Sequence, residues 1–100
     1  MSKKEKTIKC IVYECGKEPV VKEIPNTLEA LQTAVGGYIE QIRLYDNMVI
    51  LCDDEGRFKN LPVNRKVGSV TILGTFLLVG TSGSEYTSLN DWQIKLFVGG

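Results

Sequence analysis

The sequence predicts an α+β domain in which a largely antiparallel sheet carries two helices, in the order ββαββ, long loop, β, α. Short runs rich in β-branched and aromatic residues alternate with Gly, Pro and Asn turns, which is typical of hairpins. Apolar residues also recur at helical spacing in two places, near residues 28–35 and 89–97. Strands joined by short turns pair antiparallel, and each helix needs a sheet face on which to bury its apolar side.

The first two strands are expected at residues 8–14 and 20–24, joined by a turn at 15–19 that contains Gly and Pro. Residues 8–14 are apolar on both faces near the middle, which predicts a central strand. Lys22 and Glu23 place the second strand closer to an edge. Residues 1–7 are expected to be frayed, and residues 8–98 to form a single domain.

The first helix is expected to begin at Asn26, an N-cap residue, with Glu29 completing a capping box three residues later. Gly36 and Gly37 end it, because glycine accepts the left-handed conformation of a helix C-terminus. The residues expected on its buried face are Leu28, Leu31 and Val35.

Three further apolar segments predict strands. Residues 38–44 break strict alternation, which indicates a bulge, and residues 48–52 are apolar on both faces, which indicates a central strand. Residues 70–80 favour a strand in which Gly74 marks a bulge or a close approach, although a short buried helix would have a similar pattern.

The remaining segments predict two loops and a last helix. Residues 57–68 form a basic loop between apolar runs, and residues 81–86 form a flexible loop. Ser88 is the expected N-cap of the last helix, with Asp91 favourable for its dipole. The expected buried face of this helix is Leu89, Trp92 and Leu96.

Composition excludes several classes of function. The 100 residues carry 12 Lys and Arg against 12 Asp and Glu, which argues against a general nucleic-acid binder or an acidic DNA mimic. There is no histidine, so the usual general base and the commonest metal ligand are missing. The three cysteines do not form a disulfide framework and suit a reducing cytoplasm. No metal, cofactor or membrane segment is expected, because zinc ligands are too few and the longest apolar run is too short.

The basic loop is the first candidate ligand site. Arg57 and Arg65 offer guanidinium donors suited to phosphate, Asn64 adds an amide, and Pro62 limits the flexibility of the loop. The alternative is a solvated connection whose charges balance the acids at 53–55.

Other residues are weaker candidates. Gly74, Thr75 and Phe76 could line a pocket, or they could mark only a bulge. Ser88 lies near a helix N-terminus that could attract an anion, or it could serve only as a cap. The acids at 53–55 are expected to be turn residues, and the cysteines at 10 and 52 to be inert core residues.

The order of several motifs resembles a family of small domains of unknown function found in phages, mobile elements and genomes of Gram-positive bacteria. These motifs are Gly-Lys-Glu-Pro (16–19), Ile-Pro-Asn-Thr-Leu-Glu-Ala-Leu-Gln (24–32), Val-Gly-Gly-Tyr-Ile-Glu (35–40), Leu-Pro-Val-Asn-Arg (61–65), Ile-Leu-Gly-Thr-Phe (72–76) and Tyr-Thr-Ser-Leu-Asn-Asp-Trp-Gln (86–93). Carried over by position, the family pattern marks Gly36, Gly37, Tyr38, Pro62, Asn64, Arg65, Gly74, Thr75, Phe76, Ser88 and Leu89. The chain lacks the longer insertion that often separates the Asn-Arg and Gly-Thr-Phe elements in larger members.

The resemblance implies an accessory protein of a phage or mobile element. Taken with the basic loop and the missing catalytic groups, it leads us to expect a non-enzymatic protein that counters host defence in the cytoplasm. In its sharpest form it sequesters a phosphorylated nucleotide signal, in a pocket built at a homo-oligomer interface. The expected ligand-binding residues are Tyr38, Arg57, Pro62, Asn64, Arg65, Gly74, Thr75, Phe76 and Ser88. The alternative is a protein–protein inhibitor of a host defence or regulatory enzyme, acting through a sheet edge or the basic loop. An enzyme would need an unusual acid–base pair in place of histidine.

Overall fold

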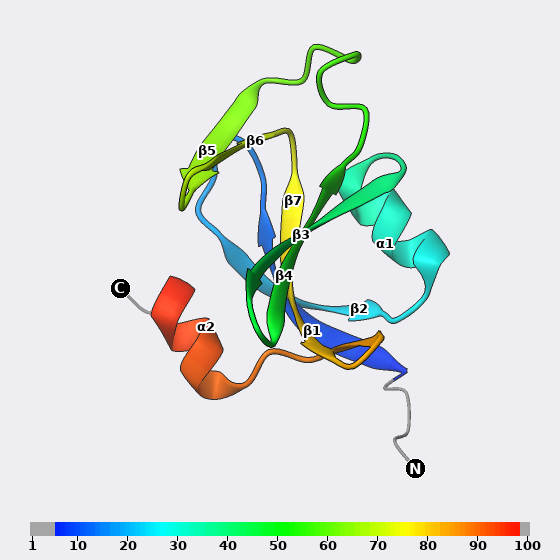
Figure 1. Cartoon of the computed structure of the whole chain (residues 1–100), viewed down its shortest axis with the longest axis vertical. Helices are drawn as coiled ribbons and strands as arrows, with labels where there is room; N and C mark the ends of the chain where they lie inside the picture. The colour runs from blue at the N-terminus through cyan, green and yellow to red at the C-terminus, as the bar shows by residue number, and fades with distance from the viewer. Residues whose placement is uncertain (1–5, 99–100) are drawn as a thin grey trace.

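A central antiparallel sheet organises the chain, and the computed structural model describes residues 6–98 (Figure 1). The order along the sheet is β2 (Val20–Pro25), β1 (Thr7–Tyr13), β7 (Phe76–Ser82), β4 (Met48–Asp53) and β3 (Ile39–Tyr45), with β8 (Glu85–Thr87) also paired to β7. The α+β class, the interior positions of β1 and β4, and the edge position of β2 are confirmed. The expected bulge lies between Arg43 and Tyr45 of β3. Of the start expected to be frayed, residues 1–5 lie outside the described residues, whereas Thr7 already pairs with Pro25.

One face of the sheet is covered by α1 (Leu28–Val35). Leu31 and Val35 of this helix are buried against apolar side chains of β1, β4 and β7. Gly36 closes the helix in the left-handed region, with φ of 90°, as expected.

The start of α1 differs from the prediction. Thr27 is the N-cap, and its hydroxyl accepts from the Ala30 backbone at 3.1 Å. Asn26 is buried instead, and its amide donates to the carbonyl oxygen of Tyr86 at 3.2 Å. The helix therefore begins one residue later, and Leu28 in its first turn is exposed rather than buried.

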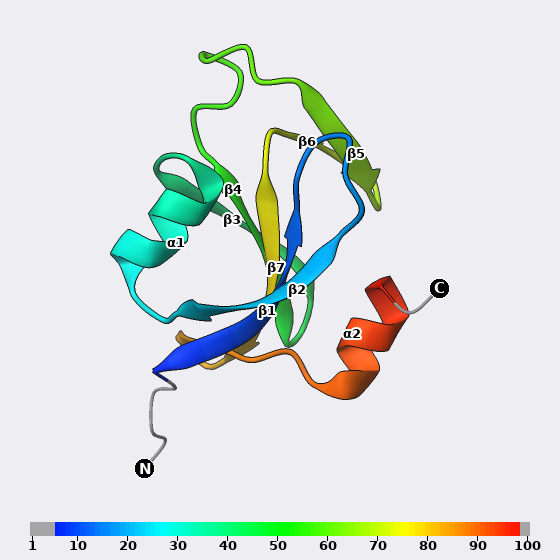
Figure 2. The same cartoon turned by 180° about the vertical axis from the view of Figure 1, so that it is seen from behind.

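The opposite face is covered by a small hairpin and a second helix, as the two opposite views show (Figures 1 and 2). The hairpin is β5 (Val63–Val67) paired with β6 (Val70–Leu73), and the helix is α2 (Asp91–Phe97). This face has its own apolar cluster, which we call the second core: Ile11, Tyr13, Met48, Ile50, Cys52, Ile72, Phe76, Leu78 and Leu89. Ile72 is the β6 residue of this cluster, and Ile94 and Phe97 of α2 pack against the cluster. Each face of the sheet thus has its own apolar cluster.

The hairpin corrects two predictions. Residues 63–67 were expected in a loop, but they form β5 with a register shift between Val63 and Arg65. Residues 70–80 were expected to be one strand, but Gly74, with φ of 74°, turns the chain between β6 and β7, which belong to different sheets. A Cβ on Gly74 would lie 2.7 Å from the Leu61 side chain, so the expected close approach is present.

The C-terminal segment differs in two further ways. Residues expected in a flexible loop at 81–86 mostly form the β7–β8 hairpin. Asn90, rather than Ser88, is the N-cap of α2, and it forms a capping box with Gln93. The helix therefore turns a different face toward the sheet than the one predicted. Trp92 and Leu96 are exposed, whereas Leu89, which precedes the first residue of the helix, is buried. Among residues 6–98, no helix is long and apolar enough to cross a membrane.

Candidate functional site

Arg65 is held in position on β5 by contacts with three residues, namely Tyr13, Asn64 and Lys17. Its guanidinium carbon lies 4.8 Å from the centre of the Tyr13 ring. Its Nε donates to the Asn64 side-chain oxygen at 3.2 Å, and its Nη2 donates to the Lys17 carbonyl at 3.4 Å. The other face of the Tyr13 ring is stacked on Phe76, with 4.4 Å between centroids and 7° between planes. Guanidinium and two rings therefore form one column that leads into the second core.

Asn64 supports this column from the backbone side. Its Nδ2 donates to the carbonyl oxygens of Tyr13 at 2.8 Å and of Gly74 at 2.9 Å. The amide thus joins β5 to β1 and to the turn before β7. Since its Oδ1 accepts from Arg65, both polar atoms of the side chain have partners within the protein, and Asn64 acts as a positioning residue.

A cavity of about 290 Å³ opens beside Arg65, between the hairpin and the sheet, and we call it the Arg65 cavity. It is lined by Tyr13, Leu44, Ile50, Arg65, Lys66, Val67, Gly68, Phe76, Leu78 and Phe97. Among the lining residues that the structure describes there are two cations and no carboxylate. Burial raises the pKa of Tyr13, although nearby Arg65 acts to lower it, so the phenol stays uncharged at neutral pH. The cavity therefore combines apolar walls with net positive charge.

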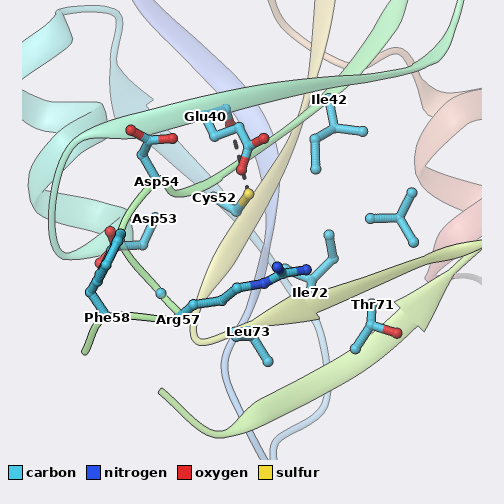
Figure 3. Close-up of a pocket in the computed structure, with 12 residues that line it drawn as sticks. Glu40, Ile42, Cys52, Asp53, Asp54, Arg57, Phe58, Thr71, Ile72 and Leu73 are labelled. Carbon is cyan, nitrogen blue, oxygen red and sulfur yellow. Dashed lines mark hydrogen bonds between the residues drawn. The ribbon is translucent and has the colours of Figure 1, made fainter. Parts of the chain in front are cut away.

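Arg57 lies in a different place. It lines a cavity of about 440 Å³, the Arg57 cavity, on the side of the hairpin that faces β3 and the end of β4 (Figure 3). Its side chain extends across the opening toward Ile72, while Glu40 approaches from β3 on the opposite side. Carboxylates therefore share this cavity, unlike the Arg65 cavity.

An ion pair anchors the loop that carries Arg57. Lys59 Nζ lies 2.7 Å from Asp53 Oδ2 and also donates to the Gly36 carbonyl at the end of α1. Asp53 Oδ1 accepts from the Glu55 backbone at 2.9 Å, which fits the expected turn role of this acid. The Lys59 charge is thus used within the protein.

The nine residues predicted as one ligand site do not meet on one surface. Thr75, which directly precedes β7, and Phe76, the first residue of β7, lie on opposite sides of the sheet. Thr75 lines a hollow beside α1, whereas Phe76 is buried in the second core. Tyr38 lies exposed near Lys59 and α1, and Ser88 accepts a hydrogen bond from the Lys9 backbone at 2.9 Å. Phe76 is buried, and one face of its ring is stacked on Tyr13.

The two remaining predicted residues, Pro62 and Gly74, are joined by a backbone hydrogen bond. The carbonyl of Pro62, just before β5, accepts from the backbone of Gly74, which follows β6, at 2.8 Å, so this bond extends the pairing of the hairpin to the turn before β7. Pro62 and Asn64 therefore contact Gly74 through hydrogen bonds within the protein.

Of the ten residues that line the Arg65 cavity, Arg65 and Phe76 were predicted as ligand-binding residues and the other eight were not, Tyr13 and Lys66 among them. Tyr13 was assigned only to a strand, and Lys66 was assigned only to the basic loop at residues 57–68. A signal for Lys66 existed, because the sequence Val67-Gly68-Ser69-Val70 has the Gly-Ser centre of a two-residue hairpin turn. That hairpin would have placed Lys66 on a strand with a defined side.

Comparison with known proteins gives a family and no characterised relative. Residues 8–99 match the model of a domain of unknown function, DUF3846. None of the curated proteins and none of the solved structures matches the chain.

Proposed function

We propose that this chain, which belongs to the DUF3846 family of domains of unknown function, binds a phosphorylated nucleotide in the Arg65 cavity without catalysis. The observation that carries the proposal is the position of Arg65. Its guanidinium is fixed by Tyr13 and Asn64 at the mouth of a cavity with no carboxylate among its described lining residues. A cation fixed in advance loses little conformational entropy when an anion binds.

Arg65 retains donors for a phosphate. A guanidinium carries five N–H groups, and the protein uses one on Nε and one on Nη2. The N–H groups that remain include both on Nη1, next to one on Nη2, which suits a paired contact with two phosphate oxygens. Lys66, exposed on the same strand, adds a second positive charge near the opening.

The walls suit the apolar part of a nucleotide. Leu44, Val67 and Phe97 line the cavity and are half-buried, so a base or ribose can contact them. Tyr13 is not available for stacking, because Arg65 and Phe76 occupy its two faces. The base therefore contacts the edge of the aromatic column and Phe97.

The size of the cavity limits how much ligand one chain encloses. A volume of about 290 Å³ lies at the lower end of the roughly 300–1,000 Å³ that small-molecule sites occupy. The cavity holds a base or a phosphate group, and the rest of the nucleotide extends past Lys66 and Gly68. A second copy of the chain covers that part, which makes the complete site a homo-oligomer.

The biological setting of the proposal rests on the sequence motifs and on the absence of histidine. The protein acts in the cytoplasm of an infected host, where it withholds a phosphorylated nucleotide signal from a defence system. In this proposal the protein is encoded by a phage or a mobile element.

Calorimetry with a panel of cyclic dinucleotides and ADP-ribose-type nucleotides tests the proposal. At least one of them is expected to bind the wild-type protein at micromolar concentration. Arg65→Ala is expected to weaken binding by at least about tenfold, since hydrogen bonds to charged groups are worth about 1.5–3 kcal/mol. Arg57→Ala is the matched control and is expected to bind normally, because Arg57 lines a different cavity. No binding by any nucleotide, with Arg65→Ala as active as wild type in an infection assay, contradicts the proposal.

One observation favours the alternative, a protein–protein inhibitor. Tyr45, Trp92 and Leu96 are all more than half exposed and surround a shallow cavity of about 270 Å³ at α2. Exposed aromatic side chains of this kind are frequent in protein interfaces. Under this alternative, Trp92→Ala abolishes protection in the infection assay, whereas Arg65→Ala leaves it unchanged.

A further inference from the structure

The Arg57 cavity carries charges of both signs that do not pair with each other. Among residues 6–98, the side chain of Arg57 forms no ion pair or hydrogen bond, and Glu40 forms no side-chain ion pair. Their charged groups are therefore more than 4 Å apart, on opposite sides of a cavity of about 440 Å³ (Figure 3). The charge of Asp53, which also lines the cavity, is already matched by Lys59 at 2.7 Å.

The space between the two charges is apolar. Two apolar side chains flank this space in the view of Figure 3: buried Ile72 lies beside the guanidinium, and half-buried Ile42 lies beside Glu40. Cys52 forms part of the same floor, and its Sγ donates to the Glu40 carbonyl at 3.7 Å. Burial raises the pKa of Cys52 to about 11, so the floor carries no thiolate at neutral pH.

We propose that the Arg57 cavity binds a free apolar α-amino acid as its zwitterion. The carboxylate pairs with the Arg57 guanidinium, the ammonium pairs with Glu40, and the side chain lies on Ile42 and Ile72. A compact zwitterion satisfies both protein charges at once, which neither an anion nor a cation does. The volume lies within the usual range of small-molecule sites, roughly 300–1,000 Å³. This site is independent of the proposed nucleotide site, since the two cavities share no lining residue.

The remaining carboxylate of the cavity does not compete for Arg57. In Figure 3 the Asp54 side chain points away from the guanidinium, at the edge of the cavity near the end of β4. It adds negative potential on the side of Glu40, where the ammonium is placed. The two ends of the ligand are thus distinguished by charge.

Titration followed by amide NMR tests the proposal with L-leucine and L-phenylalanine as probes. Two blocked analogues complete the set, namely N-acetyl-L-leucine, which lacks the ammonium, and L-leucinamide, which lacks the carboxylate. The wild-type protein is expected to bind the free amino acids, with shifts near Arg57, Glu40 and Ile72. Each blocked analogue is expected to bind at least about tenfold more weakly, since each loses one charge-assisted contact.

Variants assign the two ends of the ligand. Arg57→Ala is expected to bind leucine no more tightly than it binds leucinamide, because the partner of the ligand carboxylate is gone. Glu40→Gln is expected to bind leucine no more tightly than it binds N-acetyl-leucine, because the partner of the ligand ammonium is gone. Both side chains are exposed, so the amide spectrum should show an intact fold, and Arg65→Ala should bind leucine as wild type does. The proposal is overturned if no free amino acid shifts these resonances at millimolar concentration. It is equally overturned if N-acetyl-leucine binds as tightly as leucine, because the site is then only an anion site.

Discussion

Replacement of Asn64 by Ala tests whether this amide is structural. The change removes the donor that bonds to the Tyr13 and Gly74 carbonyls at 2.8 and 2.9 Å, and the acceptor of Arg65 Nε. A typical hydrogen bond contributes about 1 kcal/mol net, and a buried group left without a partner costs about 1–3 kcal/mol. The loss of the two carbonyl contacts should therefore destabilise the protein by about 2–3 kcal/mol.

Urea and thermal unfolding followed by circular dichroism measure this loss. For a domain of this size about 1 kcal/mol lowers the melting temperature by about 4–8 °C, so Asn64→Ala should melt roughly 10–20 °C lower. The variant should still fold, because a small domain is usually stable by about 5–15 kcal/mol.

Lys66→Ala is the matched control for Asn64→Ala. Lys66 is exposed on the same strand, and its replacement should change stability by no more than about 0.5 kcal/mol. If Asn64→Ala is as stable as this control, the amide is not a structural bridge. It would then be free for a ligand, as the sequence alone predicted.

Two further predictions concern ionisable groups. Burial raises the pKa of Asp53, but hydrogen bonds from Lys59 and from the backbone outweigh burial and hold the pKa below its ordinary value. Its stabilising contribution is then complete above about pH 4 and is lost as the pH falls through the lower folded value, so Asp53→Asn should flatten the acid dependence of the urea midpoint. An acid limb as steep as that of wild type contradicts this role. Burial also raises the pKa values of Cys10 and Cys52 to about 11, so at pH 8 a thiol reagent should label only half-buried Cys15 in the native protein. Labelling of all three before unfolding contradicts the buried positions.

Periodicity was sufficient for the parts of the fold that follow local rules. Alternation placed the strands near residues 8–14 and 48–52 in the sheet interior, and Gly36 ended α1 where the turn chemistry predicted. The caps were misplaced by one or two residues, because neighbouring polar residues compete for the same role. Asn26 is a good cap by type, but a contact with distant Tyr86 uses its side chain instead.

The hairpin was missed because its strand β5 carries polar residues for a tertiary reason. Asn64 and Arg65 look like loop residues, yet the first bridges two carbonyls and the second lies on a tyrosine ring. The contacts with Tyr13 join residues some 50 positions apart, and no local pattern encodes them. The turn at Gly74 likewise depends on Leu61, which packs where a Cβ would stand.

The candidate site shows the same division. Sequence reasoning selected Arg65 because its donors suit phosphate, and the structure places it at a cavity. It also grouped Arg65 with Arg57 and Thr75, which line two other cavities. Which charges share a cavity depends on the crossing of the hairpin over the sheet, and that crossing is set by packing of Ile72 and its neighbours in the second core.

The central claim is that Arg65, and not Arg57, holds the phosphate of a nucleotide. The most direct measurement is a calorimetric titration of the nucleotide panel into wild type, Arg65→Ala and Arg57→Ala under one buffer condition. We predict that a nucleotide binds wild type and Arg57→Ala equally and binds Arg65→Ala at least about tenfold more weakly. Equal affinity for wild type and Arg65→Ala, or loss of binding only in Arg57→Ala, contradicts the claim.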